Sequence, residues 1–334
     1  MQEDNLLKDS LETLLAERAT PAVVRAIEQG GDALSLWKDI EESGFCDAML
    51  PESQGGAELG FGAIAPLIEL CGRHALPVPL AQTMVARVLL SRAGHELPAG
   101  PVALASGAAG EAGIQVSYGA VAQHVLLQRG QKLLLLAARD AQRTQVDGES
   151  ADAWLLWPQA SLAAAPTIDA GNIDLRSIEA LLFAGQLAGA MRQTFDMSLK
   201  YANDRNQFGR PISKLQAIQH QLSVMAEHTA AGIAAARLGF NAAGELPDPL
   251  ACATAKSRCS EASALVAAGA HAVHGAIGIT AEFDLQLYTR RLYAWRTAAG
   301  SETYWNTRIG RELLASPEAG FADFVRKRLF AVNA

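Results

Sequence analysis

The chain has 334 residues, of which 50% are hydrophobic and 19% are charged, and its formal net charge at pH 7 is -7. This length provides room for two or three domains with a sizeable core, and the composition is typical of a soluble globular protein. A net negative charge without a basic cluster argues against nucleic acid and against an anionic membrane surface as partners.

The cysteines, the N-terminal residues and the apolar runs argue against a cysteine-bound metal, a signal peptide and a membrane span. The cysteines are Cys46, Cys71, Cys252 and Cys259. Their spacing is not that of a metal site, and we expect the last two to be small core residues of an Ala-rich helix. Residues 1–4 are acidic and lack the apolar core of a signal peptide. The strongly apolar run 133–138 is too short to cross a bilayer, so we expect a cytoplasmic protein without a membrane partner.

Residues 1–98 are predicted to form a helical N-terminal domain. Leucines follow a helical period over the first fifteen positions. Further helices are predicted over residues 61–74 and 81–93, separated by two prolines. Trp37 is interpreted as a core anchor of this segment, not as a binding residue.

Residues 99–170 are predicted to form a small β domain. Short apolar alternations over 102–105, 114–118, 124–128, 132–137 and 154–157 predict its strands. Gly-rich turns separate these strands, and Arg129-Gly130-Gln131 has the composition of a hairpin turn.

Residues 171–334 are predicted to form a C-terminal helical bundle. Its helices are predicted over 175–201, 215–240, 249–274, 282–295 and 301–314. Gly185 and Gly189 stand four apart on one face of the first helix and would let another backbone come close.

Two groups of residues between 178 and 216 are candidates for catalysis or binding. Glu179 stands beside a nearly all-apolar helical face, where desolvation disfavours its charged form and makes it a usable base. The alternative is a solvated carboxylate near a helix N-terminus. Arg205, Phe208 and Gly209 offer a cation, an aromatic face and a turn, which suit an adenine-pyrophosphate group.

Four pieces of the sequence, taken in order, resemble the acyl-CoA dehydrogenase family. Residues 36–56 contain Glu-Ser-Gly-Phe and Leu-Pro-Glu-Ser-Gln-Gly-Gly, and Arg-x-x-Phe-Gly at 205–209 is followed by Gln-Ala-Ile-Gln at 216–219. Gly-Ala-Ile-Gly at 275–278 stands where the family has its glycine-rich turn, and Gly-Ser at 300–301 where it has Glu-Gly-Thr. The resemblance implies a mainly α fold with a small β domain and a C-terminal four-helix bundle. It also implies α,β-desaturation of an acyl-CoA thioester with hydride transfer to FAD.

The resemblance assigns cofactor-binding roles to a set of residues. These are Arg205, Phe208, Gln216, Gly275, Gly278 and Ser301. The first three resemble residues that reach a neighbouring subunit's FAD, and the two glycines resemble a turn whose backbone N–H groups approach the pyrophosphate. Ser301 either hydrogen-bonds the flavin or caps the last helix, and both readings stay open. No metal site is expected, since His271 and His274 lack further ligands nearby.

The usual base of the family is replaced in this chain. In most members a Glu precedes the Gly-Thr near the last helix, and Ala299 stands at that position. A minority carries the base on the long helix in a Glu-Arg-Leu-x-x-Ala-Gly setting. Residues 179–185 match that setting, with Ala180 in place of the Arg. The resemblance therefore implies Glu179 as the catalytic base, with a relic or structural acid as the alternative.

The β segment departs from the family pattern. Ser-Gly-Ala-Ala-Gly at 106–110 stands in place of the Thr-Glu-Pro-x-Ala-Gly-Ser loop, and the Trp-Ile-Thr strand has no counterpart. An FAD half-site, a non-standard base and a shortened β segment together resemble the shorter subunit of heteromeric α2β2 acyl-CoA dehydrogenases of steroid side-chain CoA esters. This implies an acyl-CoA substrate, a second family member as partner, and electron-transferring flavoprotein as electron acceptor. A self-sufficient homo-oligomeric enzyme and a non-catalytic structural subunit remain as alternatives.

Overall fold

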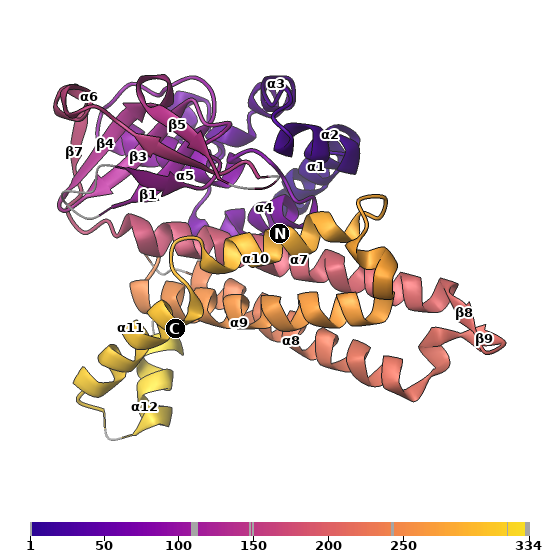
Figure 1. The fold of residues 1–334 in the computed structure, drawn as a ribbon. Coiled ribbons are helices and arrows are strands. Elements are labelled where there is room, and N and C mark those ends of the chain that lie inside the picture. Colours follow the sequence, from indigo (N-terminus) through magenta and orange to yellow (C-terminus); the bar gives the residue numbers. More distant parts are fainter. Residues whose placement is uncertain are drawn as a thin grey trace. The chain divides into compact units, whose positions relative to one another are not determined.

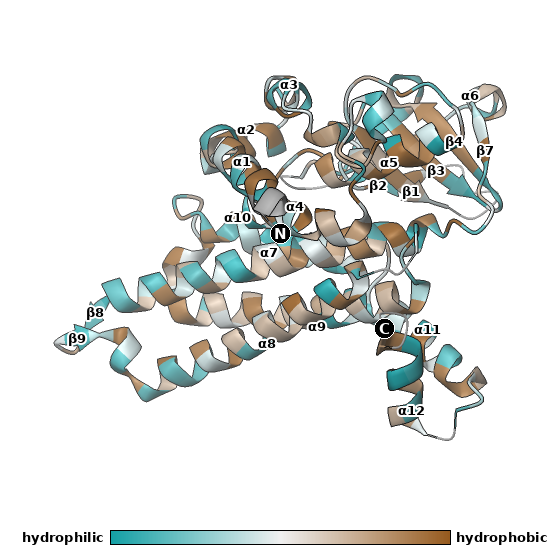
Figure 2. Ribbon diagram, turned by 180° about the vertical axis from the view of Figure 1, so that it is seen from behind, coloured by the Kyte–Doolittle hydropathy of each residue, from teal (hydrophilic) through white to brown (hydrophobic). Residues whose placement is uncertain are grey.

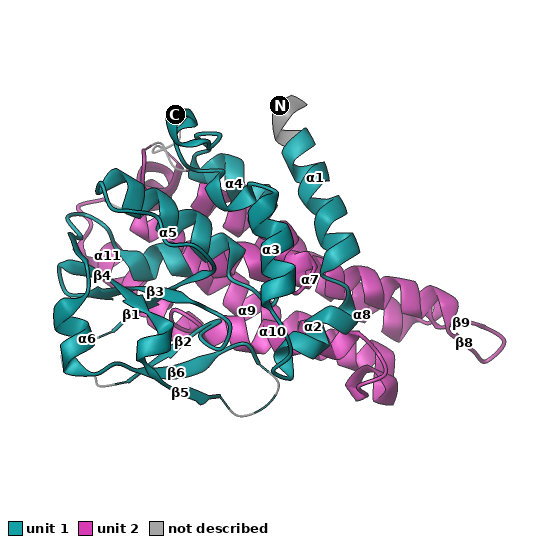
Figure 3. Ribbon diagram, turned by 90° about the horizontal axis from the view of Figure 1, so that it is seen from above, with its two compact units in different colours: residues 1–67, 76–179 teal, residues 68–75, 180–334 magenta. Residues whose placement is uncertain are grey.

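The structure, a computed structural model, describes residues 2–330 except 108–112, 147, 149, 242, 243 and 319, and of residues 2–5 it describes the backbone alone. The chain divides into two compact units, which Figure 3 shows in different colours. Unit 1 contains residues 1–67 and 76–179, and unit 2 contains residues 68–75 and 180–334. The domain boundaries near residues 98 and 170 stay a prediction.

The N-terminal part of unit 1 is helical, as the leucine periodicity predicts. Its helices are α1 (Gln2–Arg18), α2 (Pro21–Glu28), α3 (Leu34–Glu42), α4 (Phe61–Arg73) and α5 (Leu80–Arg92), with 3-10 turns at Phe45–Asp47 and Glu52–Gln54. Helix α4 continues from unit 1 into unit 2. Thr20 caps α2 through its hydroxyl, and Pro21 occupies the first helical position, where no backbone N–H is needed.

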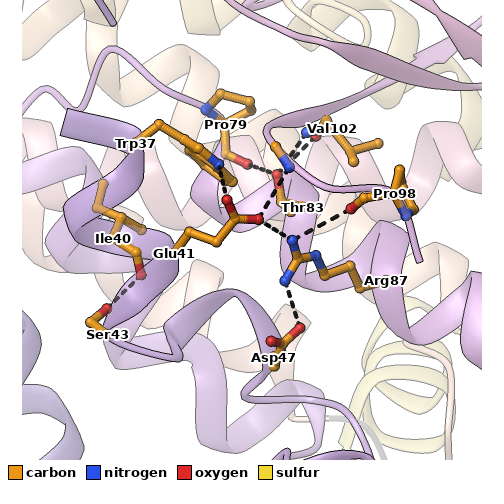
Figure 4. Close-up of polar contacts among 11 residues, drawn as sticks. Trp37, Ile40, Glu41, Ser43, Asp47, Pro79, Thr83, Arg87, Pro98 and Val102 are labelled. Atoms are coloured by element: carbon orange, nitrogen blue, oxygen red, sulfur yellow. Dashed lines mark hydrogen bonds and ion pairs between the residues drawn. The ribbon is translucent and has the colours of Figure 1, made fainter. Parts of the chain in front are cut away.

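A buried arginine ties α3, α5 and the turn between them together (Figure 4). The Arg87 guanidinium donates to Asp47 Oδ1 at 2.7 Å and to Glu41 Oε1, and the Arg87 side chain is 7% exposed. Trp37 donates from Nε1 to Glu41 Oε2 at 3.2 Å and is buried, so the prediction that it anchors the core is confirmed. Two carboxylates and one cation thus fix α5 against α3 and the turn that follows α3, 46 and 40 positions earlier in the chain.

The β part of unit 1 consists of two small sheets (Figure 1). The strands are β1 (Val102–Ser106), β2 (Ile114–Val116), β3 (His124–Arg129), β4 (Lys132–Ala137), β5 (Gln142–Gln145), β6 (Ala153–Leu156) and β7 (Thr167–Asp169), with a 3-10 turn at Ala138–Asp140 and helix α6 (Gln159–Ala164). One sheet has the order β1-β3-β4-β7, with β1 and β3 parallel, and the other has the order β2-β6-β5. Their apolar faces enclose one core, which includes Val125, Leu127 and Trp157, and Figure 2 shows β3 and β4 as strongly hydrophobic.

Unit 2 is helical, and its longest helices form a bundle. The elements are α7 (Leu175–Asp204), β8 (Asn206–Gln207), β9 (Arg210–Pro211), α8 (Gln216–Phe240), α9 (Pro249–His274), α10 (Leu285–Thr297), α11 (Glu302–Ala315) and α12 (Phe321–Val325), with short turns at Ile212–Lys214, Gly275–Ile279 and Arg326–Phe330. The first five residues of α7 belong to unit 1. Helices α8, α10 and α11 all pack against α9, and Figure 1 shows α7 and α8 joined by the β8–β9 hairpin. The mainly α fold with a small β part is confirmed.

The first half of α7 is buried on all sides and approaches other backbone closely. Residues 177–191 are all buried. A Cβ added at Gly189 would lie 1.8 Å from the Glu69 carbonyl oxygen, and one added at Gly185 would lie 2.9 Å from Ile68 Cγ2. The close approach predicted for these two glycines is therefore confirmed. It fixes the position of α7 along the 68–75 segment.

Helix α9 and the turn after it, Pro249–Ile279, are long and apolar enough to cross a membrane by length and composition. Core helices of soluble proteins meet the same criterion. Cys252 and Cys259 of this helix are buried, as predicted, and three other helices pack on it. We therefore interpret α9 as the core helix of the bundle.

Candidate functional site

The Arg-x-x-Phe-Gly motif lies on an exposed hairpin. The long helix, predicted over 175–201, ends at Asp204, and the motif that follows forms β8 and the turn that leads into β9. Phe208 and Gly209 form the two-residue turn, with φ of +53° and +77°, which matches the turn type that suits such hairpins. A bulky side chain at positive φ is rare. Because Phe208 is also 87% exposed, this strained aromatic is a candidate binding residue.

Positive charge accompanies Phe208 on this hairpin. Ile212 N donates to Arg205 O at 2.8 Å and closes the base of the hairpin, while the Arg205 side chain is exposed, as are those of Arg210 and Lys214. Gln216 is the first residue of α8 and is also exposed. An exposed aromatic face with guanidinium groups beside it is able to stack on a base and bind phosphate oxygens.

The glycine turn follows directly on α9. Gly275 caps that helix with φ of +64°, a conformation that favours glycine. A Cβ at Gly278 would lie 2.9 Å from His274 Cβ and 3.0 Å from Leu285 Cδ2. The backbone conformation at Gly275 and the close packing at Gly278 thus each explain a glycine without any ligand. The approach of these two residues to a pyrophosphate stays a prediction.

An aromatic cluster brings the hairpin and the glycine turn to the same end of unit 2. Tyr201, one turn before Arg205, stacks on His274 with ring centroids 4.5 Å apart, and Phe283 lies 5.2 Å from His274. His274 Nδ1 donates to the Ala270 carbonyl at 2.8 Å, since a carbonyl only accepts. Burial is the main cause that lowers the pKa of His274. His274 is therefore a packed residue whose neutral form is favoured by burial.

The turn that precedes α11 carries the position of the family's usual base. Ala299 and Gly300 both have positive φ, +54° and +109°. Ser301 is the N-cap of α11, but its side chain makes no capping hydrogen bond. Ser301 thus occupies the N-cap position, as one of its two readings predicts, without a capping bond from its side chain. Its contact with a flavin stays a prediction.

Ala299 lies close to the helix that carries Glu179. It packs against a buried cluster of Ala180, Ala253 and Trp305. Ala180 directly follows Glu179 in α7, and Ala180 and Ala299 both belong to unit 2. The Glu179 side chain is itself only 6% exposed, and the alternative of a solvated carboxylate is wrong.

The loop that stands in place of the family's flavin loop begins at the end of β1. Residues 108–112 lie outside the described structure, so most of the 106–110 segment cannot be placed. Ser106 is described, and its hydroxyl oxygen is buried with no hydrogen-bond partner among the described residues. A buried hydroxyl without a partner is costly unless a ligand or water satisfies it.

One residue of the site was missed by sequence reasoning. Lys256 in α9 is fully buried, and its Nζ donates to the Gly300 carbonyl at 3.1 Å. The available signal was a single lysine within an Ala-rich helix. A long cationic side chain at such a position is rarely buried unless it is paired.

Two family models match the chain. The acyl-CoA dehydrogenase N-terminal domain matches residues 1–97, and the acyl-CoA dehydrogenase C-terminal domain matches residues 177–314. Among curated proteins, acyl-CoA dehydrogenase IpdE2 of Mycobacterium tuberculosis is 30% identical over 324 residues, which cover 95% of this chain and 99% of the relative.

Solved structures show the same fold. A variant of the Tcur3481–Tcur3483 steroid ACAD superposes with a TM-score of 0.78 at 23% identity, covering 94% of this chain and 98% of that one. The ChsE4–ChsE5 complex from Mycobacterium tuberculosis superposes with a TM-score of 0.75 at 22% identity, covering 95% of this chain and 99% of that one.

Proposed function

The chain belongs to the acyl-CoA dehydrogenase family, and from this premise we propose that it is one subunit of a heteromeric enzyme that desaturates bulky, steroid-derived CoA esters. The family's cofactor is FAD, and its reaction forms a double bond between the α and β carbons of an acyl-CoA thioester. The observation that carries the proposal is the burial of the Glu179 carboxyl, 6% exposed, on α7.

Glu179 serves as the proton acceptor in this proposal. The substrate loses a proton from the carbon next to the thioester carbonyl and a hydride from the following carbon. Bound FAD supplies the acceptor for that hydride. A carboxylate with little solvation is a stronger base than one in water, and Ala299 at the usual base position has no group to compete with it. The cluster that joins Ala299 to Ala180 supports this assignment.

The residues of unit 2 fit the ADP end of FAD. Phe208 offers an exposed ring and Arg205 an exposed cation on a hairpin that extends beyond the helices (Figure 1). Side chains presented in this way suit a cofactor that is held mainly by another subunit. The unpaired hydroxyl of Ser106 at the end of β1 supplies one further polar group for a ligand of unit 1.

A second family member is the proposed partner. The structural relatives support it, since the ChsE4–ChsE5 complex is named for two chains and the other relative is described as the Tcur3481–Tcur3483 steroid ACAD. We further propose electron-transferring flavoprotein as the electron acceptor, a role in lipid breakdown, and a cytoplasmic location. The acidic composition of the chain agrees with that location.

Co-expression with a neighbouring acyl-CoA dehydrogenase chain tests the proposal. We expect a purified complex with a flavin absorbance spectrum and turnover of a steroid side-chain CoA ester, and a colourless, inactive chain when it is expressed alone. A chain that is yellow and active by itself would contradict the heteromeric assignment.

The variant Glu179→Gln addresses the base within the same complex. We expect it to keep the flavin spectrum and to lose at least about a hundredfold in turnover, within the range of general base catalysis. Glu28→Gln is the matched control, because Glu28 in α2 is buried to a similar degree, 3% exposed. Equal turnover of Glu179→Gln and the wild type would leave the chain a structural subunit.

A further inference from the structure

A buried lysine supports the turn between α10 and α11. Lys256 lies in the interior of α9 and is fully buried. Acceptors of its Nζ include Ser260 Oγ at 2.8 Å and the carbonyl oxygens of Trp295 at 2.9 Å, Arg296 at 2.8 Å and Gly300 at 3.1 Å. Three of the acceptors thus belong to the end of α10 and to the turn after it.

These acceptors help to retain a cation in the interior. The carbonyls of Trp295 and Arg296 lie in the last turn of α10, where carbonyl groups lack helical partners and the helix dipole is negative. Ser260 adds to the same arrangement, because its hydroxyl donates to the Arg296 carbonyl at 3.0 Å. Charge-assisted bonds from one ammonium group therefore replace the backbone bonds that α10 loses at its end.

The turn itself has a backbone that needs such support. Ala299 and Gly300 adopt φ of +54° and +109° in succession, and an alanine in the left-handed region costs about 1 kcal/mol or more. Two further contacts hold the same turn. Trp305 Nε1 donates to the Gly300 carbonyl at 3.1 Å, and Arg296 forms an ion pair with Glu302 across the turn, with Nε–Oε2 at 3.1 Å.

Ser301, the residue after this turn, has a hydroxyl group that is able to bind a ligand. Ser301 begins α11 without using its hydroxyl as a cap. On the other side of Gly300, Ala299 packs against Ala180 of α7, next to Glu179. The position of Gly300, which Lys256 binds directly, therefore determines where the Ser301 hydroxyl lies relative to α7.

We propose that Lys256 is a positioning residue for cofactor binding: it holds residues 299 and 300 in their left-handed turn and so places the Ser301 hydroxyl for a hydrogen bond to FAD. This inference rests on the proposed function of the chain. It assigns the effect of Lys256 on FAD affinity to the Ser301 side chain, and a double-mutant cycle of these two residues therefore tests it.

The cycle uses the full complex after removal of its flavin, with FAD affinity measured by the quenching of flavin fluorescence on titration. Ser301→Ala is expected to weaken FAD binding about five- to tenfold, the effect of one hydrogen bond. Lys256→Met is expected to weaken it at least as much. Because Ser301 is already misplaced in Lys256→Met, adding Ser301→Ala to that variant is expected to change the affinity by less than about twofold. Lys38→Met, on a side chain 73% exposed in α3, is the control and is expected to bind FAD like the wild type.

The outcomes distinguish positioning from general stability. If the effects of Lys256→Met and Ser301→Ala multiply in the double variant, Lys256 does not act through Ser301 and the inference is wrong. If Ser301→Ala alone leaves FAD affinity unchanged, the inference also fails, while the role of Glu179 is still decided by Glu179→Gln turnover. Should Lys256→Met not fold, Ser260→Ala replaces it in the cycle. That variant keeps the cation and removes one acceptor, and we expect a two- to threefold loss of affinity that is again non-additive with Ser301→Ala.

Discussion

Gly189 lies on the helix that carries Glu179, where the backbone of the 68–75 segment comes close, and its replacement by alanine has a predictable cost. The added Cβ would lie 1.8 Å from the Glu69 carbonyl oxygen and 2.8 Å from Arg73 N. Because Cβ contacts below 3.0 Å are essentially never seen, the Glu69 backbone must move by about 1.2 Å (3.0 minus 1.8). Backbone cannot rotate away as a side chain does, so the cost lies at or above the upper end of the usual 1–3 kcal/mol for overpacking.

The gain in helix propensity opposes this cost only in part. Glycine to alanine in a helix interior is worth about 1 kcal/mol, and we expect Gly189→Ala to lower the free energy of unfolding by about 2–4 kcal/mol. Gly310 in α11 is the matched control, because a Cβ there would meet nothing within 4 Å. Gly310→Ala is expected to raise the free energy of unfolding by about 0.5–1 kcal/mol.

Urea unfolding followed by circular dichroism gives both values, provided that the dependence on denaturant is the same in the variants. The two substitutions are chemically identical and are expected to have opposite signs. If Gly189→Ala lies within about 0.5 kcal/mol of the wild type, the packing of α7 against the 68–75 segment is not as close as described.

Three further predictions concern a buried cation, a buried imidazole and the hairpin. Arg87→Met is expected to lower the free energy of unfolding, measured with urea, by about 2–3 kcal/mol, less than the roughly 3–5 kcal/mol lost when a fully buried ion pair is broken. The loss is smaller because the side chains of Glu41 and Asp47 are 32% and 31% exposed and can rehydrate. An unchanged free energy of unfolding would contradict the contacts in Figure 4. Burial lowers the pKa of His274 below its usual 6.5, so the unfolded chain takes up a proton first as the pH drops. Stability is therefore expected to fall as the pH drops through about 6.5. His274→Phe is expected to flatten this dependence between about pH 7.5 and 5, and an unchanged slope would refute the lowered pKa of His274. Phe208→Gly is expected to leave the free energy of unfolding unchanged or higher, since the backbone is at φ of +53°, yet to weaken FAD binding by the complex; equal FAD affinity would remove Phe208 from the site.

The helical part of the fold follows from local signals. Helix α9 extends over Pro249–His274 as predicted, because Asp248 and Pro249 begin it and Gly275 ends it. Strand β4, Lys132–Ala137, also matches its prediction because its apolar run has clear limits. Strand β5 was missed since all four of its residues are exposed, and no buried face marks it in the sequence.

The candidate site was predictable to the extent that it depends on motifs. Arg205, Phe208 and the glycine turn were singled out by their resemblance to family motifs, but the positive φ of Phe208 depends on the hairpin that follows α7. Lys256 was not found because its acceptors stand 39–44 positions later in the chain, apart from Ser260. Contacts between distant residues depend on how helices pack, and a single sequence does not contain that information.

Removal of the substrate's α-proton by Glu179 is tested most directly by isotope exchange. A 3-thia analogue of a steroid side-chain CoA ester keeps an acidic α-proton but has no β-hydride to give, so exchange into D2O reports on the base alone. We expect the complex to exchange this proton, Glu28→Gln to exchange it at the same rate, and Glu179→Gln to lose at least about a hundredfold in rate. Exchange by Glu179→Gln at the wild-type rate would contradict the assignment of Glu179 as the base.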